Sequence, residues 1–303
     1  MSDRARVDEV LTSLLNLCRP LEPFDMPLLD AHGATLSEDI YAGDRLVMKS
    51  GSRIRSTQIG LAASIGLDHL PTRPHPRVVV ISAGPDLVEP GIDLVGDEEY
   101  ETNSWLLTTA VRETGAVAYR VHSIPENEDQ LQNAIEDQLV RADLIIISGE
   151  RHDDSFDLIT RTLQKFGEVS AVEIAIESGG RHNYGTIGPD KTPVVTLPGD
   201  PVAAYISFEL LVRPMIRTML GAATIHRPSV KAKLEKALTS VSGVRSYVRA
   251  VLSEDGKSVL PLGSQDEQAT LSDANAFIAV PEGEAELVAG TEVTVVVLER
   301  RYI

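Results

Sequence analysis

The stretch PVVTLPGDPVAAYISFELL, residues 193–211, places an apolar strand, a Pro-Gly turn and a helix in direct succession. Pro198 and Gly199 predict a tight turn at the end of the strand, and Asp200 is a good N-cap residue. Pro201 has the fixed φ that suits a first helical turn. Such a helix directs free amides into the crevice at the carboxyl end of a sheet, where an anion can bind. Spacing alone favours the simpler interpretation, a well-capped helix.

The same alternation of strand and helix runs through the sequence before this stretch. Apolar runs that predict strands are RVVVISAG, AVAYRVHSI and DLIIISG. Segments that predict helices are TNSWLLTTAVRETG, which ends at Gly115, NEDQLQNAIEDQLVRA and DSFDLITRTLQKFG. Strands alternating with helices of this length indicate right-handed crossovers in a three-layer sheet. The fold class is therefore α/β, with an α/β/α central domain.

Different patterns flank this central region. RVDEVLTSLLNLCRPLEP predicts an amphipathic helix that ends before Pro20, and SGSRIRSTQIGLAASIGLDHL predicts a strand, a cap at Ser56 or Thr57 and a helix through Ile65. A proline-rich joint, TRPHP, follows Pro71. After GAATIHRP no clear helix is predicted, only short strands. The expected division is an N-terminal segment 1–74, an α/β domain 75–222 and a small β domain 225–303.

Composition limits the classes of function. The chain has 303 residues, 43% hydrophobic content and a net charge of −17, which argues against a general nucleic-acid binder. No apolar run reaches the roughly 20 residues that span a bilayer, and the first residues contain no signal-peptide core, so direct membrane insertion is not expected. The single cysteine, Cys18, lies at helical spacing from Leu14 and predicts a core residue. A cytoplasmic protein is expected.

Polar residues follow three of the predicted strands. Asp86 lies in the loop SAGPDLVEPG, and Asn103 lies at a helix start, where it could cap the helix or face a ligand. Trp105 follows one position into that helix and is expected in the core or an interface. The third loop is SGERHDDSFD, residues 148–157. Its His152, Asp153, Asp154 and Asp157 are metal-ligand types, but their spacing matches no closed metal motif, so no metal site is expected.

Several motifs together resemble one family, the molybdopterin molybdenumtransferases, which include bacterial MoeA proteins and the E domain of gephyrin. The resemblance runs through nearly the whole chain. It rests on PLLDAHGATLSEDIYA, SGSRIRSTQIGLAASIGL, RPHPRVVVISAGPDLVEPG, YETNSWLL, LPGDPVAAYISFELLVRP and LSDANAFIAVPEGEAELVAGTEVTVVVL. It implies a molybdopterin-binding-like central domain, a dimerising N-terminal segment and a C-terminal β domain.

The chain departs from the family at the predicted site. The extra β domain that family members carry after the first strand is missing near residues 42–43, where SEDIYA passes almost directly to GDRLVMKSGSRI. The family loop S-G-G-V-S-V-G-x-x-D has become SGERHDDSFD, with Glu150 in place of a glycine. The family K-P-G-K-P has become ESGGR, Glu177 to Arg181, without either lysine. Reversed charge in a phosphate cleft opposes phosphate binding.

The resemblance therefore implies a vestigial ligand cleft with no confident catalytic residue. Its members are Asp86, Asn103, Ser148, Gly149, Asp157, Pro198, Gly199, Asp200 and Pro201. The favoured hypothesis is a non-catalytic, homodimeric, gephyrin-like scaffold with no cofactor. An active molybdenumtransferase with a reorganised site remains open, and it would use adenylylated molybdopterin, molybdate and Mg. A pterin adenylyltransferase is the third hypothesis, and the loss of the glycine-rich loop also counts against it.

The expected partner of a scaffold is a short peptide tail of a cytoskeletal or membrane protein, by analogy with gephyrin. Apolar anchors in a polar-rimmed groove are the usual basis of peptide recognition, and an acidic surface favours a tail that carries Lys or Arg. Candidate groove residues in the C-terminal domain are Tyr247, Leu262, Phe277, Ile278, Val280 and Pro281. For Phe277 taken singly, a core position is the better interpretation.

Overall fold

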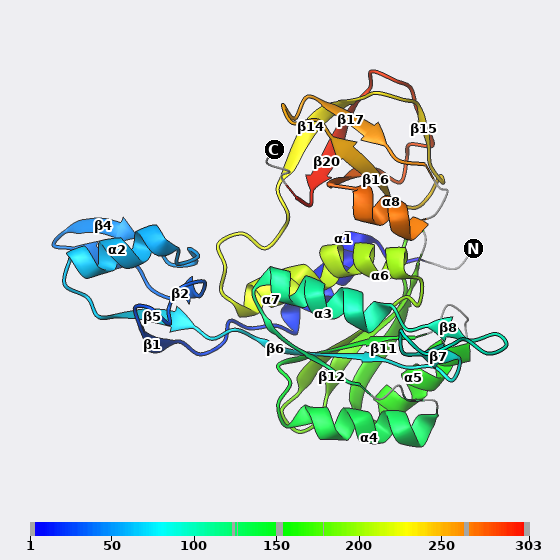
Figure 1. Ribbon diagram of the computed structural model, residues 1–303, viewed down its shortest axis with the longest axis horizontal. Coiled ribbons are helices and arrows are strands. Elements are labelled where there is room, and N and C mark those ends of the chain that lie inside the picture. Colours follow the sequence, from blue (N-terminus) through cyan, green and yellow to red (C-terminus); the bar gives the residue numbers. More distant parts are fainter. Residues whose placement is uncertain are drawn as a thin grey trace.

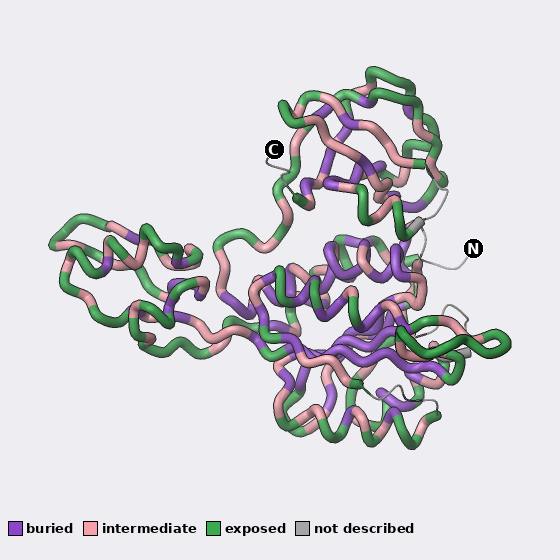
Figure 2. The backbone as a smooth tube through the Cα atoms, in the orientation of Figure 1, coloured by how far each residue is buried: buried purple, intermediate pink, exposed green. Residues whose placement is uncertain are grey.

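A computed structural model describes residues 4–122, 125, 127–149, 154–177, 179–263 and 267–299. The chain forms three bodies, which Figure 1 shows as a projecting N-terminal lobe, a layered α/β body and a C-terminal barrel. The α/β body lies between the other two along the sequence and carries the predicted cleft. Figure 2 shows that its central strands are buried almost throughout.

The N-terminal lobe is built from two small sheets and one helix. A three-stranded sheet has the order β1-β5-β2, with β1 Phe24–Pro27, β2 Thr35–Leu36 and β5 His69–Arg73. Strands β3 Ile40–Ala42 and β4 Arg45–Met48 form a hairpin through Gly43 and Asp44, and Gly43 has a φ of 61°. The sequence analysis places the absence of the family's extra β domain near residues 42–43, and this tight turn lies there.

One prediction for the N-terminal segment needs correction. The cap of helix α2, Ser56–Ser64, is Arg55 and not Ser56 or Thr57, and the Arg55 backbone amide donates to the Gln58 side chain at 3.2 Å. Helix α1, Val7–Asn16, packs on the α/β body, because its apolar face joins the core of that body. Cys18 is buried there, and burial raises its pKa to about 12, so the thiol belongs to the core as predicted.

The central sheet has six strands in the order β11-β12-β13-β10-β6-β9. Strands β6 Arg77–Ser82, β9 Val117–Arg120, β10 Leu144–Ser148 and β13 Thr192–Leu197 pair in parallel. Strands β11 Gly167–Glu173 and β12 Arg181–Ile187 form an antiparallel hairpin that the sequence analysis missed. Because β11 is largely exposed and carries several polar residues, it lacks the apolar run that marks the buried strands.

Helices cover both faces of this sheet and complete three layers (Figure 1), which confirms the predicted fold class. One face is covered by α1 and by α3 Asn103–Thr114, α6 Pro201–Ser207 and α7 Arg213–Met219. The other is covered by α4 Glu128–Leu139 and α5 Asp154–Phe166. The expected long helix after residue 200 is interrupted by a π-helical turn, η1 Phe208–Val212, in which Glu209 is buried.

The C-terminal domain is a closed barrel with the order β14-β17-β16-β18-β20. Its strands are β14 Ser229–Leu234, β16 Ser246–Leu252, β17 Ser258–Pro261, β18 Ala276–Val280 and β20 Glu292–Val297. A short helix, α8 Glu267–Asp273, lies before β18, although the sequence predicts no helix in this region. Seven residues are too few to show a clear helical period.

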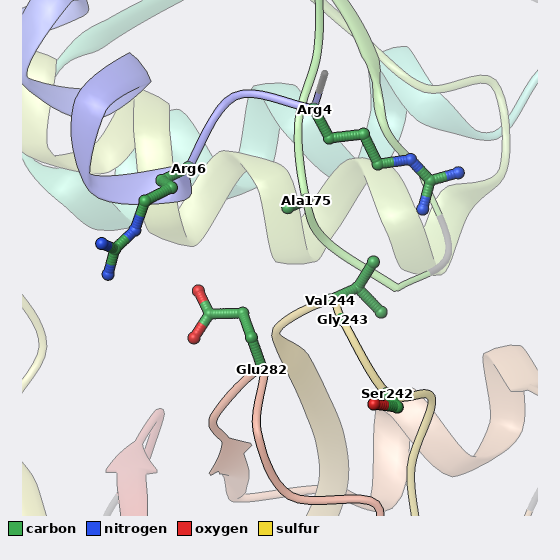
Figure 3. A pocket seen from close by; sticks show the side chains of 7 residues that line it. All are labelled: Arg4, Arg6, Ala175, Ser242, Gly243, Val244 and Glu282. Carbon is green, nitrogen blue, oxygen red and sulfur yellow. The ribbon is translucent and has the colours of Figure 1, made fainter. Parts of the chain in front are cut away.

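A cavity of about 570 Å³ lies where the N-terminal arm, the α/β body and the barrel meet. Figure 3 shows Arg4 and Arg6 on one side of it and Glu282 on the opposite side. Arg4 pairs with Glu173 at 2.8 Å, and Arg245 bridges Glu282 at 3.2 Å. None of the predicted cleft residues lines this cavity, so we interpret it as a domain seam.

The buried His182 on β12 predicts that the stability of the protein depends on pH. The ring is buried, its Nε2 lies 3.1 Å from Ser207 Oγ, and burial lowers its pKa to about 4 from an ordinary 6.5. Between pH 6.5 and pH 4 the unfolded state therefore binds a proton that the folded state does not. We expect the unfolding free energy to fall by about 3 kcal/mol as pH drops through this window and to be constant above it.

Chemical denaturation at a series of pH values measures this dependence, with His182→Gln as the matched variant. The variant keeps a polar side chain near Ser207 but cannot titrate. A wild-type pH profile that matches the His182→Gln profile between pH 4 and pH 6.5 would refute the assignment.

Candidate functional site

Two parallel strands, β10 and β13, and the start of helix α3 bring several predicted cleft residues together at the carboxyl end of the sheet. Asn103, the first residue of α3, is buried, and its side-chain amide donates to Ser148 Oγ at 2.7 Å and to the Gly199 carbonyl at 2.7 Å. Ser148 ends β10, and Gly199 lies in the turn after β13. The structure thus brings together Asn103, Ser148, Gly149 and the Pro198–Pro201 turn.

The amide oxygen of Asn103 is buried and has no hydrogen-bond partner among the described residues. Its orientation is fixed, because the amide nitrogen faces the carbonyl oxygens of Pro198 and Gly199, which only accept. Asn103 also lines the cavity at this edge. A buried acceptor without a partner is costly, and it suits a ligand that carries an N–H donor.

The turn that opens α6 has the structure predicted for it. Asp200 is the N-cap, its Oδ1 accepts from the Ala203 amide at 2.9 Å, and Pro201 occupies the first helical turn. The Asp200 side chain already accepts from the Ala203 amide, which is one of the backbone donors that an anion bound at this helix start would need. A Cβ added to Gly179 would lie 2.8 Å from Pro198 Cγ, so the ESGGR loop approaches this turn closely only because residue 179 is glycine.

A buried carboxylate that the sequence analysis did not identify forms one wall of the cleft. Glu101 is 1% exposed and accepts from Ser82 Oγ at 2.6 Å and from the Ser104 backbone amide at 2.7 Å. Its second oxygen accepts from Ser104 Oγ at 2.5 Å and faces Arg120 at 3.3 Å. The Ser82, Ser104 and Arg120 side chains are therefore engaged within the protein.

Arg120 connects this carboxylate to the surface of α3. Its guanidinium also pairs with Glu89 and lies 4.2 Å from the ring centroid of Trp105. The Nε of Arg120 donates a hydrogen bond to Ser104 Oγ at 2.6 Å. Trp105 is half exposed and donates to Glu89 at 3.3 Å, so of the two predicted positions, core or interface, the core is excluded. One cation is shared by two carboxylates, which leaves the network with excess negative charge.

One cavity among the described residues of the cleft is small. A cavity of about 30 Å³ is lined by Leu87, Glu99, Tyr100, Glu101, Thr102, Asn103, Gly149, Gly199 and Pro201. That volume is about the share of one water molecule in the liquid. The described walls carry two carboxylates, Glu99 and Glu101. Two carboxylates on the described walls oppose the binding of a phosphate in this cavity.

Other predicted residues lie outside this cavity. Asp86 is exposed, and its backbone carbonyl accepts a hydrogen bond from the Glu99 amide at 2.8 Å. Asp157 forms an exposed pair with Arg181 at 3.2 Å, and the Glu177 amide donates to the Arg245 carbonyl of the barrel. The predicted roles of Glu150, His152 and Asp153 fall on residues outside the described ranges. Within those ranges, no cluster of His, Cys, Asp and Glu could hold a metal ion.

The predicted peptide groove in the barrel is wrong for its central members. Ile278 and Val280 are fully buried inside the barrel, and Phe277 is 1% exposed with its ring against Tyr205 of α6. Alternate residues of β18 face opposite sides, so one side fills the barrel and the other packs on the α/β body. Tyr247 is also packed against that body, while Leu262 is partly exposed and Pro281 is exposed.

A groove of about 500 Å³ lies instead between the α/β body and the segment around α8. Its apolar lining includes Leu106, Ala110 and Leu271, and exposed carboxylates at Glu113 and Glu299 lie on its rim. Arg227 also lines the groove, but its charge is held by a bidentate pair with Glu209 at 2.7 and 2.8 Å. The groove is therefore apolar at its base, and the charged groups on its rim that have no ion pair among the described residues are the carboxylates of Glu113 and Glu299.

Of the residues that the sequence analysis missed, only Glu101 had a detectable signal. Glu101 lies two residues before the helix that begins at Asn103, and an acidic residue at a helix start is a capping pattern. Arg120, Glu89 and Ser82 had no such signal, because their meeting depends on tertiary packing between the β6, β9 and α3 segments.

Comparisons with known proteins agree with this architecture. Residues 79–218 match the family model described as "Probable molybdopterin binding domain", and residues 231–298 match "MoeA C-terminal region (domain IV)". Two Mycobacterium tuberculosis proteins, molybdopterin molybdenumtransferases 2 and 1, are 34% and 32% identical to the chain over 85% and 86% of its length. The chain spans only 65% and 63% of those two relatives.

Solved structures share the fold at lower identity. The MoeA protein of Pyrococcus horikoshii superposes with a TM-score of 0.83 at 20% identity, covering 98% of this chain and 100% of that one. A molybdenum cofactor biosynthesis protein of Pyrococcus furiosus gives a TM-score of 0.77 at 24% identity, covering 97% and 99%. The chain therefore carries a molybdopterin-binding-like domain and a MoeA C-terminal domain, and it is similar to MoeA proteins over most of its length. No helix in the described ranges is long and apolar enough to cross a membrane.

Proposed function

We propose that this chain is a non-catalytic, homodimeric scaffold of the MoeA family, in the cytoplasm, that binds the peptide tail of a protein partner. The observation that carries the non-catalytic part is the Glu101 carboxylate in a cleft of about 30 Å³. A phosphate placed beside Glu99 and Glu101 meets repulsion, and repulsion is strongest where water is excluded. The Arg120 guanidinium cannot offset it, because Glu89 and Glu101 already hold its charge.

The interdomain groove supports the peptide-binding part of the proposal. Leu106, Ala110 and Leu271 offer apolar contacts, while the exposed carboxylates of Glu113 and Glu299, which form no ion pair within the described ranges, favour a cationic ligand. A tail that places Lys or Arg beside apolar anchors fits both features. The net charge of −17 increases the rate at which such a basic peptide meets the protein.

Peptide binding is tested with synthetic tails in a fluorescence anisotropy titration. We expect a tail of apolar residues flanked by Lys or Arg to bind, and an acidic version of it to bind at least tenfold more weakly. Reversing the rim with Glu113→Lys and Glu299→Lys is expected to weaken binding of the basic tail about tenfold, whereas Glu136→Lys on α4 leaves it unchanged. Equal binding by both rim variants and wild type would reject this groove.

The N-terminal lobe supports the homodimer. Four large apolar side chains of the lobe are exposed, at 46%, 86%, 54% and 44% of their surfaces: Phe24, Leu29, Tyr41 and Leu46. The lobe projects away from the α/β body (Figure 1), which leaves these side chains free to contact a second copy. Clustered exposed apolar residues are a usual sign of an interaction surface.

Light scattering coupled to gel filtration tests the dimer. We expect twice the chain mass of 32.8 kDa at micromolar concentration, and the monomer mass for the double variant Leu29→Asp with Tyr41→Asp. The matched control is Val140→Asp, an exposed apolar residue on the α/β body. A wild-type monomer at this concentration would reject the proposal.

A second candidate function is molybdenum insertion, with adenylylated molybdopterin and molybdate as substrates and Mg as cofactor. It is favoured by the Asn103 amide oxygen, which is buried, has no described partner and lines the cleft cavity. A pterin ring offers N–H donors for such an acceptor, provided that the cleft opens. Asn103→Asp would then abolish activity, whereas a scaffold would keep its peptide affinity in the same variant.

A further inference from the structure

A separate cavity of about 510 Å³ opens where α3 lies beside the edge strand β9. The residues that matter for its chemistry are Trp105, Thr108, Arg112, Tyr119, Arg120 and Arg141. It shares no lining residue with the cleft cavity. Three arginines and two aromatic rings in one cavity are notable on a chain of net charge −17.

Two of the three guanidiniums keep their positive charge uncompensated. Arg141 donates its Nε to the neutral side-chain oxygen of Gln138 at 2.8 Å and forms no ion pair within the described ranges. Arg112 is exposed, and no described residue forms an ion pair or side-chain hydrogen bond with it. Arg120 differs, since Glu89 and Glu101 neutralise it. Within the described part of the chain, the cavity therefore presents two cations that have no ion pair.

The aromatic rings hold part of this charge in place. The guanidinium of Arg141 lies 4.7 Å from the ring centroid of Tyr119, and that of Arg120 lies 4.2 Å from the centroid of Trp105. Such stacking fixes an arginine without neutralising it. Trp105 remains 50% exposed, so its indole also offers apolar surface to a ligand.

Thr108 supplies an independent observation. It lines the cavity, is 5% exposed, and its hydroxyl has no hydrogen-bond partner within the described ranges. Its neighbours on α3 behave differently, because Thr109 and Thr114 donate to the carbonyls four residues before them, at 3.0 and 2.9 Å. A buried hydroxyl that has no partner among the described residues, in the lining of a cavity that also contains Arg112 and Arg141, indicates a group that a ligand completes.

We propose that this cavity binds a small organic phosphate that carries a flat ring. The phosphate lies against Arg112 and Arg141, whose planar guanidiniums match phosphate oxygens. Thr108 donates its hydroxyl to the same anion or to the group next to it. The ring packs on the exposed indole of Trp105. This cavity borders the proposed peptide groove, with which it shares the lining residue Thr109, and it shares no lining residue with the cleft cavity.

Isothermal titration calorimetry with AMP as the probe tests the site, with adenosine and inorganic phosphate as separate titrants. We expect AMP to bind, and Arg112→Gln and Arg141→Gln each to weaken it at least about tenfold. Thr108→Val is expected to weaken it severalfold, and Arg19→Gln, which removes a distant exposed arginine, to leave it unchanged. Adenosine is expected to bind more weakly than AMP, and higher salt to weaken AMP binding.

Three results would overturn the proposal. One is the absence of binding by both AMP and inorganic phosphate. Another is AMP binding that is the same in Arg112→Gln, Arg141→Gln and wild type, since the ligand would then lie elsewhere. The third is adenosine binding as tightly as AMP. Peptide binding is measured separately, so failure of this proposal and failure of the scaffold proposal are distinguishable.

Discussion

Replacing Glu209 with Gln is expected to lower the free energy of unfolding by about 3–5 kcal/mol. The carboxylate is buried in the π-helical turn and accepts two hydrogen bonds from Arg227, at 2.7 and 2.8 Å. Arg213 lies 3.7 Å from it. Removing the negative charge leaves both arginines without their charge partner in a mostly buried setting. Since Arg227 also donates to the Leu298 carbonyl, the loss should loosen the barrel from the α/β body.

Urea denaturation measures this effect, and Glu136→Gln is the matched control. Glu136 is exposed on α4 and interacts with the neutral Gln132 side chain. Its replacement is expected to change stability by less than about 0.5 kcal/mol. Equal stability of the two variants would mean that Glu209 does not join the domains.

Phe277→Ala is expected to cost about 3–5 kcal/mol of unfolding free energy, which is the usual range for a buried phenylalanine. Its ring is 1% exposed and lies edge-on to Tyr205, with centroids 6.2 Å apart. Thermal or urea unfolding measures the loss. Val288→Ala in the same domain, at a side chain that is 69% exposed, should change stability by less than about 0.5 kcal/mol.

The Phe277→Ala variant also tests whether Phe277 belongs to the hydrophobic core or lines a peptide groove. If Phe277 belongs to the core, as its burial indicates, peptide affinity per folded molecule should be unchanged in Phe277→Ala at low temperature. If Phe277→Ala instead keeps its stability within about 1 kcal/mol but loses peptide binding, Phe277 would line the peptide groove that the sequence predicts.

The regular parts of the fold could be predicted from the sequence for clear physical reasons. Buried parallel strands such as Leu144–Ser148 are continuous apolar runs, and the Asp200–Pro201 start of α6 carries the chemistry of its own cap. Both signals are local. The β11–β12 hairpin was missed because its strands are partly exposed and polar. Helix α8 was missed because it is only seven residues long.

The candidate site was harder to predict, because its decisive contacts are not local. Asn103 could be proposed from its place at a helix start, but its contact with Gly199 joins residues 96 positions apart. Glu101 and Arg120 are linked only through the packing of α3 on β9. The sequence did indicate a cleft that disfavours anions. In the described structure the carboxylates that line the cleft are Glu99 and Glu101, whereas Glu177 lies against the barrel.

The central claim is that the cleft does not bind the substrates of molybdenum insertion. Calorimetric titration of the wild-type chain with adenylylated molybdopterin, alone and with molybdate, tests it most directly. A molybdenumtransferase such as that of Mycobacterium tuberculosis, run beside it, shows that the ligand is competent. We predict no measurable binding by this chain, because the cleft is small and acidic. Micromolar binding that Asn103→Asp abolishes would contradict this account and identify the chain as an active member of its family.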